Sequence, residues 1–234
     1  MFTVGLLGGM SWESSSLYYR LLNERIRDEL GGLHSAPCLL HSVDFAEIAA
    51  LQRAERWDDA ADLLARAAQG LEASGAQLLL LCTNTMHKVA DDVQKAVGIP
   101  LLHICDTTAE AALSAGLSRV GLLGTGFTME QDFYRDRLAD HGLDVLVPGD
   151  VDRGEVHRII FDELCQGIVR EESREVYRQV IGRLVERGAQ GVLLACTEIE
   201  LLISAGDATV PLLPTTYLHV EAAVARMLAS SDRT

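Results

Sequence analysis

The chain has 234 residues and a mass of 25.4 kDa, and 48% of its residues are hydrophobic, enough to fill a sizeable core. Its formal charge of −14 and pI near 4.8 argue against a nucleic-acid partner, because a phosphate backbone needs a basic face. The sequence has neither the basic start of a secretory signal nor an apolar run of the roughly 18 residues that span a bilayer. We therefore expect a soluble, cytoplasmic protein with no nucleic-acid or membrane partner.

The cysteines and histidines indicate neither a disulfide framework nor a metal site. Five cysteines form no Cys-x-x-Cys pair, and the chain is large enough to fold without disulfides, so reduced thiols are expected. The seven histidines show no paired ligand spacing, which is typical of surface or hydrogen-bonded polar residues. We predict that the protein binds no metal.

Short apolar runs typical of strands alternate with helical segments throughout the chain. The run Leu78 to Cys82 is apolar at every position, which favours a parallel strand covered by helices on both faces. Alternation of this kind predicts an α/β fold with parallel sheets and right-handed crossovers. Strands are predicted at residues 3–7, 36–42, 78–82, 101–103, 120–123, 145–147 and 191–195, and the main helices at 57–74, 88–97, 129–141, 152–167, 174–187 and 217–229.

Three ordered matches indicate an internal duplication. Val-Gly-Leu-Leu-Gly begins at Val4 and again at Val120, an offset of 116 positions (120 − 4). An apolar strand followed by Cys-Thr occurs at Cys82 and at Cys196, an offset of 114 (196 − 82), and Pro-Leu-Leu follows both copies. We therefore predict two similar domains related by a pseudo-twofold axis, with the ligand in the cleft between them.

Cys82 and Cys196 are candidate acid and base groups. Each ends a buried strand next to a Thr-containing turn, where helix amides can lower a thiol pKa toward neutrality. Two thiols facing each other across a small molecule suit racemisation or epimerisation, in which one removes a proton and the other delivers one to the opposite face. Cys38, Cys105 and Cys165 have no repeat partner and are interpreted as small buried hydrophobic residues.

Five motifs resemble those of the aspartate/glutamate racemase family over essentially the whole chain. They are Gly8-Gly-Met-Ser-Trp-Glu-Ser, Ser42-Val-Asp-Phe-Ala-Glu-Ile, Cys82-Thr-Asn-Thr-Met-His-Lys, Gly124-Thr-Gly-Phe-Thr-Met and Cys196-Thr-Glu-Ile. The resemblance implies a two-domain α/β fold, one catalytic cysteine from each domain, no pyridoxal phosphate or other cofactor, and a homodimer. It also implies discontinuous domains, residues 1–105 with 212–234 and residues 106–211.

The same resemblance implies which side chains bind the amino-acid substrate. Polar groups that hold the α-carboxylate and α-amine follow both cysteines and the second glycine turn. Some relatives carry threonine in place of the first cysteine and favour one enantiomer, but this chain has both cysteines, so action in both directions is expected. The predicted substrate-binding residues are Met10, Gln52, Thr83, Asn84, Thr85, Thr125, Thr128 and Thr197.

The substrate side chain and several rival functions are left open. Aspartate-specific relatives place basic residues in two regions that here read Asp44 to Ile48 and Phe161 to Cys165, without Arg or Lys, so Gln52 would meet a neutral or polar side chain. The chain thus resembles the broad-specificity branch. Alternatives are an aspartate/glutamate-specific or hydantoin-type racemase, a related lyase, and a non-catalytic small-acid binding protein. A nucleotide-binding protein is disfavoured, because neither glycine turn fits Gly-x-Gly-x-x-Gly.

Overall fold

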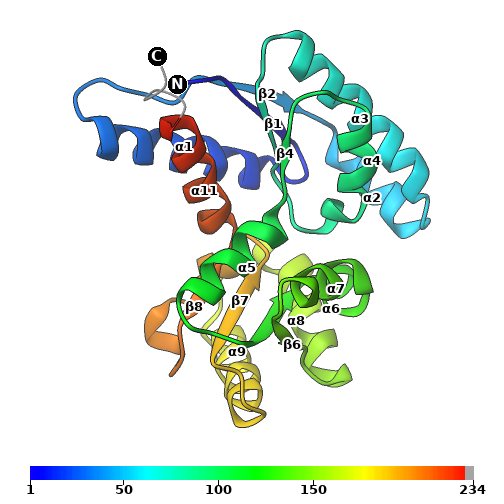
Figure 1. The fold of residues 1–234 in the computed structure, drawn as a ribbon. Coiled ribbons are helices and arrows are strands. Elements are labelled where there is room, and N and C mark those ends of the chain that lie inside the picture. Colours follow the sequence, from blue (N-terminus) through cyan, green and yellow to red (C-terminus); the bar gives the residue numbers. More distant parts are fainter. Residues whose placement is uncertain (230–234) are drawn as a thin grey trace. The chain divides into compact units, whose positions relative to one another are not determined.

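The computed structural model describes residues 1–229, which divide into two units. The first unit comprises Met1–Ile104 and the chain from His219 onward, and the second comprises Cys105–Leu218. The chain therefore leaves the first unit after Ile104 and returns to it at His219. The crossings predicted from the sequence follow residues 105 and 211. Each unit is an α/β domain with one parallel four-stranded sheet, as the alternating pattern predicts (Figure 1).

The first unit has the strand order β2-β1-β3-β4, with every neighbouring pair parallel. Helix α1 begins after a serine N-cap, Ser11, and is longer than the other helices of this unit. The predicted helix at 88–97 begins instead as a 3-10 turn, η1, before it becomes α4. The elements are β1 Val4–Gly8, α1 Trp12–Leu30, β2 Cys38–Ser42, α2 Phe45–Arg53, α3 Trp57–Ala73, β3 Leu78–Leu81, η1 Thr85–Val89, α4 Ala90–Lys95, β4 Leu101–Leu102 and α11 Thr215–Ala229.

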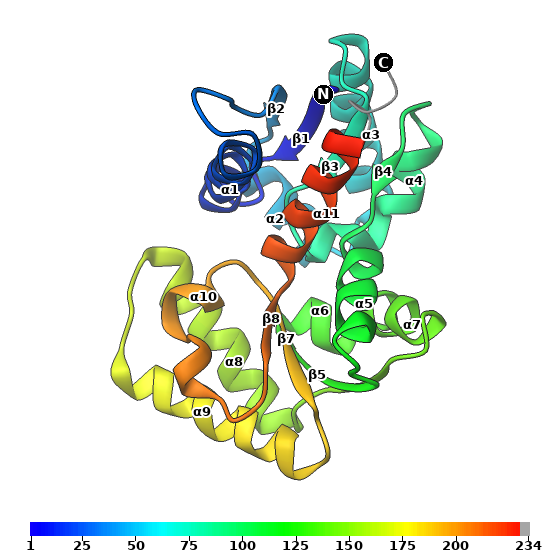
Figure 2. The ribbon, with the colours of Figure 1, turned by 60° about the vertical axis from the view of Figure 1, so that its left-hand side comes forward.

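Alternate side chains of the first sheet enter two separate hydrophobic clusters. Leu6 and Leu80 face α1 and α11, whereas Leu7 and Leu81 face α2, α3 and α4. Figure 2 shows these helices on the two sides of the sheet. Because both faces are covered, β1 and β3 are apolar or glycine at every position, as a buried parallel strand requires.

The second unit repeats this topology with the order β6-β5-β7-β8, again all parallel. Leu123, Val192 and Leu194 pack against α8 and α9 in one cluster. The predicted helix at 129–141 is divided into α6 and α7 at Gln131, whose backbone is extended. The elements are α5 Ile104–Ser114, β5 Arg119–Gly124, α6 Gly126–Glu130, α7 Asp132–Asp140, β6 Asp144–Leu146, α8 Asp150–Asp162, η2 Leu164–Gln166, α9 Glu171–Glu186, β7 Gly191–Ala195, α10 Ile199–Leu202, η3 Ala205–Asp207 and β8 Leu212–Pro214.

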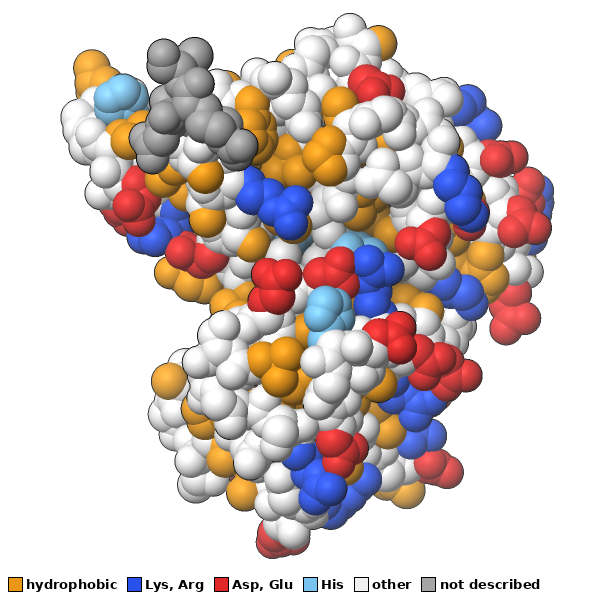
Figure 3. Space-filling model, in the orientation of Figure 1, with side chains coloured by type: hydrophobic (Ala, Val, Ile, Leu, Met, Phe, Trp, Pro, Cys, Tyr) orange, Lys and Arg blue, Asp and Glu red, His pale blue; other side chains and the backbone are white. Residues whose placement is uncertain are grey.

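Two features of the structure concern its surface charge and the character of its helices. On the face shown in Figure 3, lysine and arginine side chains are interspersed with acidic ones and form no continuous basic patch. Among residues 1–229, no helix combines the length and the apolar character needed to cross a lipid bilayer.

Candidate functional site

The turn after β3 holds the first predicted thiol. Cys82 follows the last strand residue, and its N–H donates to the carbonyl of Leu7 on β1. Its side chain is fully buried in the cluster that contains Leu78, Leu80 and the core residues of α1 and α11, and its Sγ lies 3.7 Å from the carbonyl oxygen of Leu80. Burial, with a smaller contribution from Cys38, raises the pKa of the Cys82 thiol. The Cys82 side chain therefore has the surroundings of a hydrophobic core residue.

The turn after β7 holds the second predicted thiol and a carboxylate. The Sγ of Cys196 donates to Oε2 of Glu198 at 3.0 Å, and the hydroxyl of Thr197 donates to the same oxygen at 2.6 Å. All three side chains are at least nine-tenths buried. Burial raises the pKa of Cys196 well above its usual value, and the charge and hydrogen bond of Glu198 raise it further. Glu198 was not among the predicted site residues, although it stands in the Cys196-Thr-Glu motif.

Strand register shows that the two cysteines are not equivalent positions. The equivalent residues Leu7 of β1 and Leu123 of β5 pair with Leu81 and Leu194, respectively. One residue later, Cys82 therefore corresponds to Ala195. Thr83 is the residue whose register position in the first sheet is equivalent to that of Cys196 in the second. Since successive side chains of a strand point to opposite faces, the Cys82 side chain belongs to the other face of its sheet.

A signal for this offset exists in the sequence. Gly-Ala-Gln precedes both strands, and the side-chain oxygen of each glutamine, Gln77 and Gln190, accepts a backbone N–H from the first residues of the neighbouring strand region. Counted from these glutamines, Cys82 is the fifth residue and Cys196 the sixth. Matching the Cys-Thr letters alone concealed this one-residue difference.

The remaining predicted residues of the β3 turn lie close to one another along the chain. Thr83 is half-buried, whereas Asn84 and Thr85 are buried at the start of η1. His87 in the same 3-10 turn contacts the carbonyl oxygen of Thr83 through Nδ1 at 2.7 Å. The sequence did not single out His87, because an isolated histidine gives no specific signal. The turn is therefore held from within by a buried imidazole.

Met10 and Gln52 lie elsewhere in the first unit. Met10 is buried in the turn after β1, next to Gly9, whose φ of +91° suits glycine. Gln52 on α2 is also buried, and its Nε2 lies 2.9 Å from the Sδ of Met86. Met10 and Met86 belong to the same hydrophobic cluster. The Gln52 amide is thus directed at a methionine of the turn that carries Thr85.

The predicted threonines of the second unit belong to two neighbouring turns. Thr125 is the N-cap of α6, and its Oγ1 lies 3.2 Å from that of Thr128. Because Gly124 pairs with Ala195, this cap follows the strand next to the one that carries Cys196. The N–H of Gly126 donates to Nδ1 of His157 at 2.9 Å. His157 lies on α8, so this hydrogen bond connects the turn to that helix. Thr197 contacts Glu198, as described above.

One expectation drawn from the sequence needs correction here. Helix amides were expected to favour the thiolate of both cysteines, but desolvation dominates and raises both pKa values. Three histidines, His87, His103 and His219, are buried with neighbouring rings in the first unit. Within residues 1–229, no group of three or more His, Cys, Asp or Glu side chains is placed to hold a metal ion.

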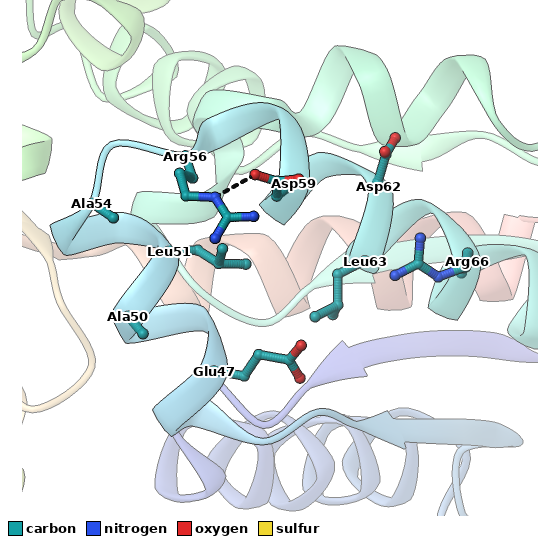
Figure 4. A pocket seen from close by; sticks show the side chains of 9 residues that line it. All are labelled: Glu47, Ala50, Leu51, Ala54, Arg56, Asp59, Asp62, Leu63 and Arg66. Atoms are coloured by element: carbon teal, nitrogen blue, oxygen red, sulfur yellow. Dashed lines mark hydrogen bonds and ion pairs between the residues drawn. The ribbon is translucent and has the colours of Figure 1, made fainter.

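A hollow of about 550 Å³ lies between α2 and α3, and none of the predicted site residues lines it. Figure 4 shows the ion pair of Arg56 with Asp59 at its rim, and the side chains of Glu47 and Arg66 on opposite helices. Most of its lining side chains are exposed and of both charges. We interpret this hollow as a surface groove between two helices.

Comparison with known proteins agrees with the fold and the motifs. A family model described as Asp/Glu/Hydantoin racemase matches residues 7–223. The crystal structure of a putative Asp/Glu racemase from Yersinia pestis is 52% identical and covers 97% of this chain and 100% of its own, with a TM-score of 0.93. That of PH1733, an aspartate racemase homologue from Pyrococcus horikoshii OT3, is 35% identical, covers 98% and 100%, and has a TM-score of 0.86.

A more distant relative is the broad specificity amino-acid racemase RacX of Bacillus subtilis (strain 168), which is 22% identical over 163 residues, 68% of each chain. The predicted α/β fold with two domains is confirmed by these structures, and so is the resemblance seen in the motifs. The chain belongs to the Asp/Glu/hydantoin racemase family and is an isomerase of the racemase type.

Proposed function

We propose that this chain is a cofactor-independent amino-acid racemase, in which Cys196 is one of the two groups that exchange a proton with the substrate α-carbon. The observation that carries this proposal is the buried Cys196 and Glu198 pair, 3.0 Å apart at the end of β7. A thiol next to a carboxylate has a nearby acceptor for its proton, as general acid-base chemistry requires. A structural core cysteine needs no such partner.

Glu198 allows Cys196 to work in both protonation states. When the thiol proton passes to Glu198 Oε2, Cys196 becomes a thiolate and Glu198 a carboxylic acid. The thiolate then removes the α-proton of the amino acid and becomes a thiol again. In the reverse direction the thiol gives its proton to the α-carbon, and Glu198 returns one to the sulfur. Net charge and protons balance in each step.

Substrate binding lowers the barrier set by the raised thiol pKa. An α-ammonium group next to Cys196 would favour the thiolate by direct charge attraction. The carbanion formed after proton loss spreads its charge onto the carboxylate, which needs preorganised donors. The hydroxyls of Thr125, Thr128 and Thr197 and the polar groups of Asn84 and Thr85 are suitable donors. We propose these residues, with Met10 and Gln52, as the substrate-binding set.

The second acid-base group is proposed to be Thr83. The two-thiol prediction assigns this role to Cys82, and that assignment stays a prediction. Two observations support Thr83 instead: it is level with Cys196 in the strand register, and it is half-buried, whereas Cys82 is fully buried among core residues. A hydroxyl is a poorer base than a thiolate, so we expect action in both directions with unequal turnover of the two enantiomers.

The proposed substrate has a side chain other than, or in addition to, a carboxylate. Arg158, the nearest base to the second family region, makes ion pairs with Glu155 and with the buried Glu163. Arg53, near the first region, is exposed. Neither region contains a basic side chain to pair with the side-chain carboxylate of an aspartate substrate, which supports a substrate specificity broader than aspartate. RacX is described as broad in specificity and PH1733 as an aspartate racemase homologue, so aspartate stays in the test panel.

Proton NMR in D2O tests the proposal. The protein is incubated, without added cofactor, with L-Asp, L-Glu, L-Ser, L-homoserine, L-Lys, L-Met or L-Ala, and the α-proton signal and the D-enantiomer are followed. Loss of the signal together with D-enantiomer names the substrate. If the folded protein exchanges none of these amino acids, the racemase proposal is wrong, and a non-catalytic small-acid binding protein becomes the better interpretation.

Thr83→Val separates the two assignments of the second group. Valine keeps the shape of threonine but has no hydroxyl, so inversion should fall by about 10² or more if Thr83 transfers the proton. Cys82→Ser replaces the thiol of the other candidate residue by a hydroxyl of similar volume. If Cys82→Ser abolishes inversion while Thr83→Val preserves it, the original two-thiol assignment holds.

Three further predictions accompany this function. The chain is expected to form a homodimer, to be cytoplasmic, and to have the domain boundaries 1–105 with 212–234 and 106–211. Light scattering after size exclusion would measure the assembly state.

A further inference from the structure

His87 makes a hydrogen bond through each ring nitrogen, which fixes its tautomer. Nδ1 lies 2.7 Å from the carbonyl oxygen of Thr83, and Nε2 lies 3.2 Å from the backbone nitrogen of Ile104. A carbonyl can only accept and a backbone N–H can only donate. Nδ1 therefore carries the proton, Nε2 is the acceptor, and the ring is neutral.

These two bonds join the candidate site to the next strand of the sheet. Thr83 follows β3, and Ile104 follows β4, which pairs with β3 through Leu80 and Leu102. Ile104 is also the last residue of the first unit before the chain enters the second. His87 thus links the turn that carries Thr83 to the segment where the chain leaves the unit.

Neighbouring histidines hold the His87 ring in place. The ring of His103 lies 4.5 Å away and that of His219 5.8 Å away, centroid to centroid. His219 is fully buried, accepts from the Tyr18 hydroxyl at Nδ1 and donates from Nε2 to the Leu102 carbonyl, both at 2.8 Å. Both ring nitrogens of His219 are thus hydrogen-bonded in the neutral form of the ring. The ring that lies next to the imidazole of His87 is therefore uncharged.

We infer that His87 is a positioning residue for the racemase reaction: by donating to the Thr83 carbonyl, it fixes the turn from which Thr83 reaches the substrate. This inference rests on the proposed function. The Thr83 carbonyl is bonded to the α-carbon that bears the hydroxyl side chain, so fixing that peptide plane limits the rotation of Thr83. A shift of about 1 Å at a reacting group can cost about a hundredfold in rate.

Two single substitutions separate the two hydrogen bonds. In His87→Asn the amide nitrogen takes the place of Nδ1, so the bond to Thr83 can be kept while the bond to Ile104 is lost. In His87→Gln the amide oxygen takes the place of Nε2, so only the Ile104 bond can be kept. His87→Ala removes both. His34→Asn is the control, because His34 is exposed.

The readout compares inversion with isotope exchange in D2O, using both enantiomers of the amino acids of the panel above, because exchange with retention is expected only for the enantiomer whose α-proton Cys196 removes. When Cys196 removes the α-proton and Thr83 fails to deliver one, the exchanged Cys196 thiol returns deuterium to the same face. Exchange with retention then continues while inversion falls. We expect about a hundredfold loss of inversion in His87→Ala and His87→Gln, near wild-type inversion in His87→Asn and His34→Asn, and exchange with retention kept within a few-fold in all.

A merely structural role gives a different pattern. The inference is overturned if exchange and inversion fall together, or if His87→Asn is as defective as His87→Ala while circular dichroism shows that all variants are folded. It is also overturned, together with the proposed function, if the wild-type protein exchanges no amino acid. Failure of the His87 inference alone is recognised because the wild-type protein still racemises.

Discussion

The turns after β3 and β7 begin with the same two residues, Cys-Thr, but their cysteines have different surroundings. Cys196 shares a buried carboxylate with Thr197, whereas the Cys82 thiol lies near a main-chain carbonyl inside a hydrophobic cluster. The register explains the difference, because Thr83 and not Cys82 is level with Cys196. A repeat in the sequence letters is therefore not always a repeat in three dimensions.

The largest expected effect comes from removing one thiol at a time. Cys196→Ala should lower inversion by about 10³-fold, because it removes a group that transfers the proton directly. Cys82→Ala should leave inversion within about threefold of wild type and cost about 1 kcal/mol of stability, as a small deletion in a core does. Chiral chromatography of the product measures inversion, and urea unfolding measures stability. Equal and severe loss in both variants would restore the symmetric two-thiol site.

Glu198→Gln tests the contrast between the two cysteines, because it removes the carboxylate charge next to the Cys196 thiol. Inversion should fall by about 10², because the thiol loses its proton acceptor. The pKa of Cys196 should fall, because the charge and hydrogen bond of Glu198 raise it in the wild type, although burial continues to hold it high.

Iodoacetamide labelling of the peptide that carries Cys196, measured against pH, tests the direction of this shift. The labelling profile of Glu198→Gln should move to lower pH than that of the wild type. Labelling of the partly buried Cys38, which lies in the first unit, serves as the internal control and should keep its profile. An unchanged Cys196 profile with full activity would show that Glu198 only supports the turn.

Much of this molecule is predictable from its sequence, and the failures have physical causes. Apolar runs located the strands, and the parallel topology followed from their alternation with helices. The different surroundings of Cys82 and Cys196 come from one residue, since a one-residue shift along a strand exchanges the two faces of the sheet. The raised thiol pKa values could not be predicted, because desolvation depends on helices that are distant in sequence.

The glycine turns after β1 and β5 also differ, in the backbone conformation of one equivalent residue. Gly9 has φ +91° and its added Cβ would overlap the Val43 backbone, whereas the equivalent residue Thr125 has φ −66°. Gly9→Ala should therefore destabilise the first unit by about 2 kcal/mol. Both tryptophans, Trp12 and Trp57, lie in this unit, so their fluorescence during urea unfolding reports on it.

Gly70→Ala is the matched control for Gly9→Ala within the same unit. Gly70 lies inside α3 with no neighbouring atom closer than 4.0 Å to an added Cβ. Alanine should stabilise the helix there by about 0.5–1 kcal/mol, because it loses less backbone entropy than glycine on folding. Similar destabilisation by both substitutions would mean that the Gly9 turn has no special backbone requirement.

A pH-dependent effect on stability is expected from the neutral His219, whose ring lies 5.8 Å from that of His87, centroid to centroid. Burial lowers the pKa of His219 to about 4 in the folded protein, against a usual value of 6.5. As the pH falls below 6.5 the unfolded chain takes up a proton that the folded protein does not, so this contribution to stability is complete above 6.5 and is lost progressively toward pH 4. The loss between pH 8 and pH 5.5 should be about 1.4 kcal/mol.

His219→Gln isolates this contribution, because glutamine does not titrate. The variant should be less stable than the wild type at pH 8, since the bonds to Tyr18 and Leu102 are disturbed. Its own loss of stability between pH 8 and pH 5.5, read from tryptophan fluorescence in urea, should be smaller than that of the wild type by about 1.4 kcal/mol. If the variant and the wild type lose the same stability between pH 8 and pH 5.5, His219 titrates near its usual pKa, and the first unit tolerates a protonated His219 next to His87.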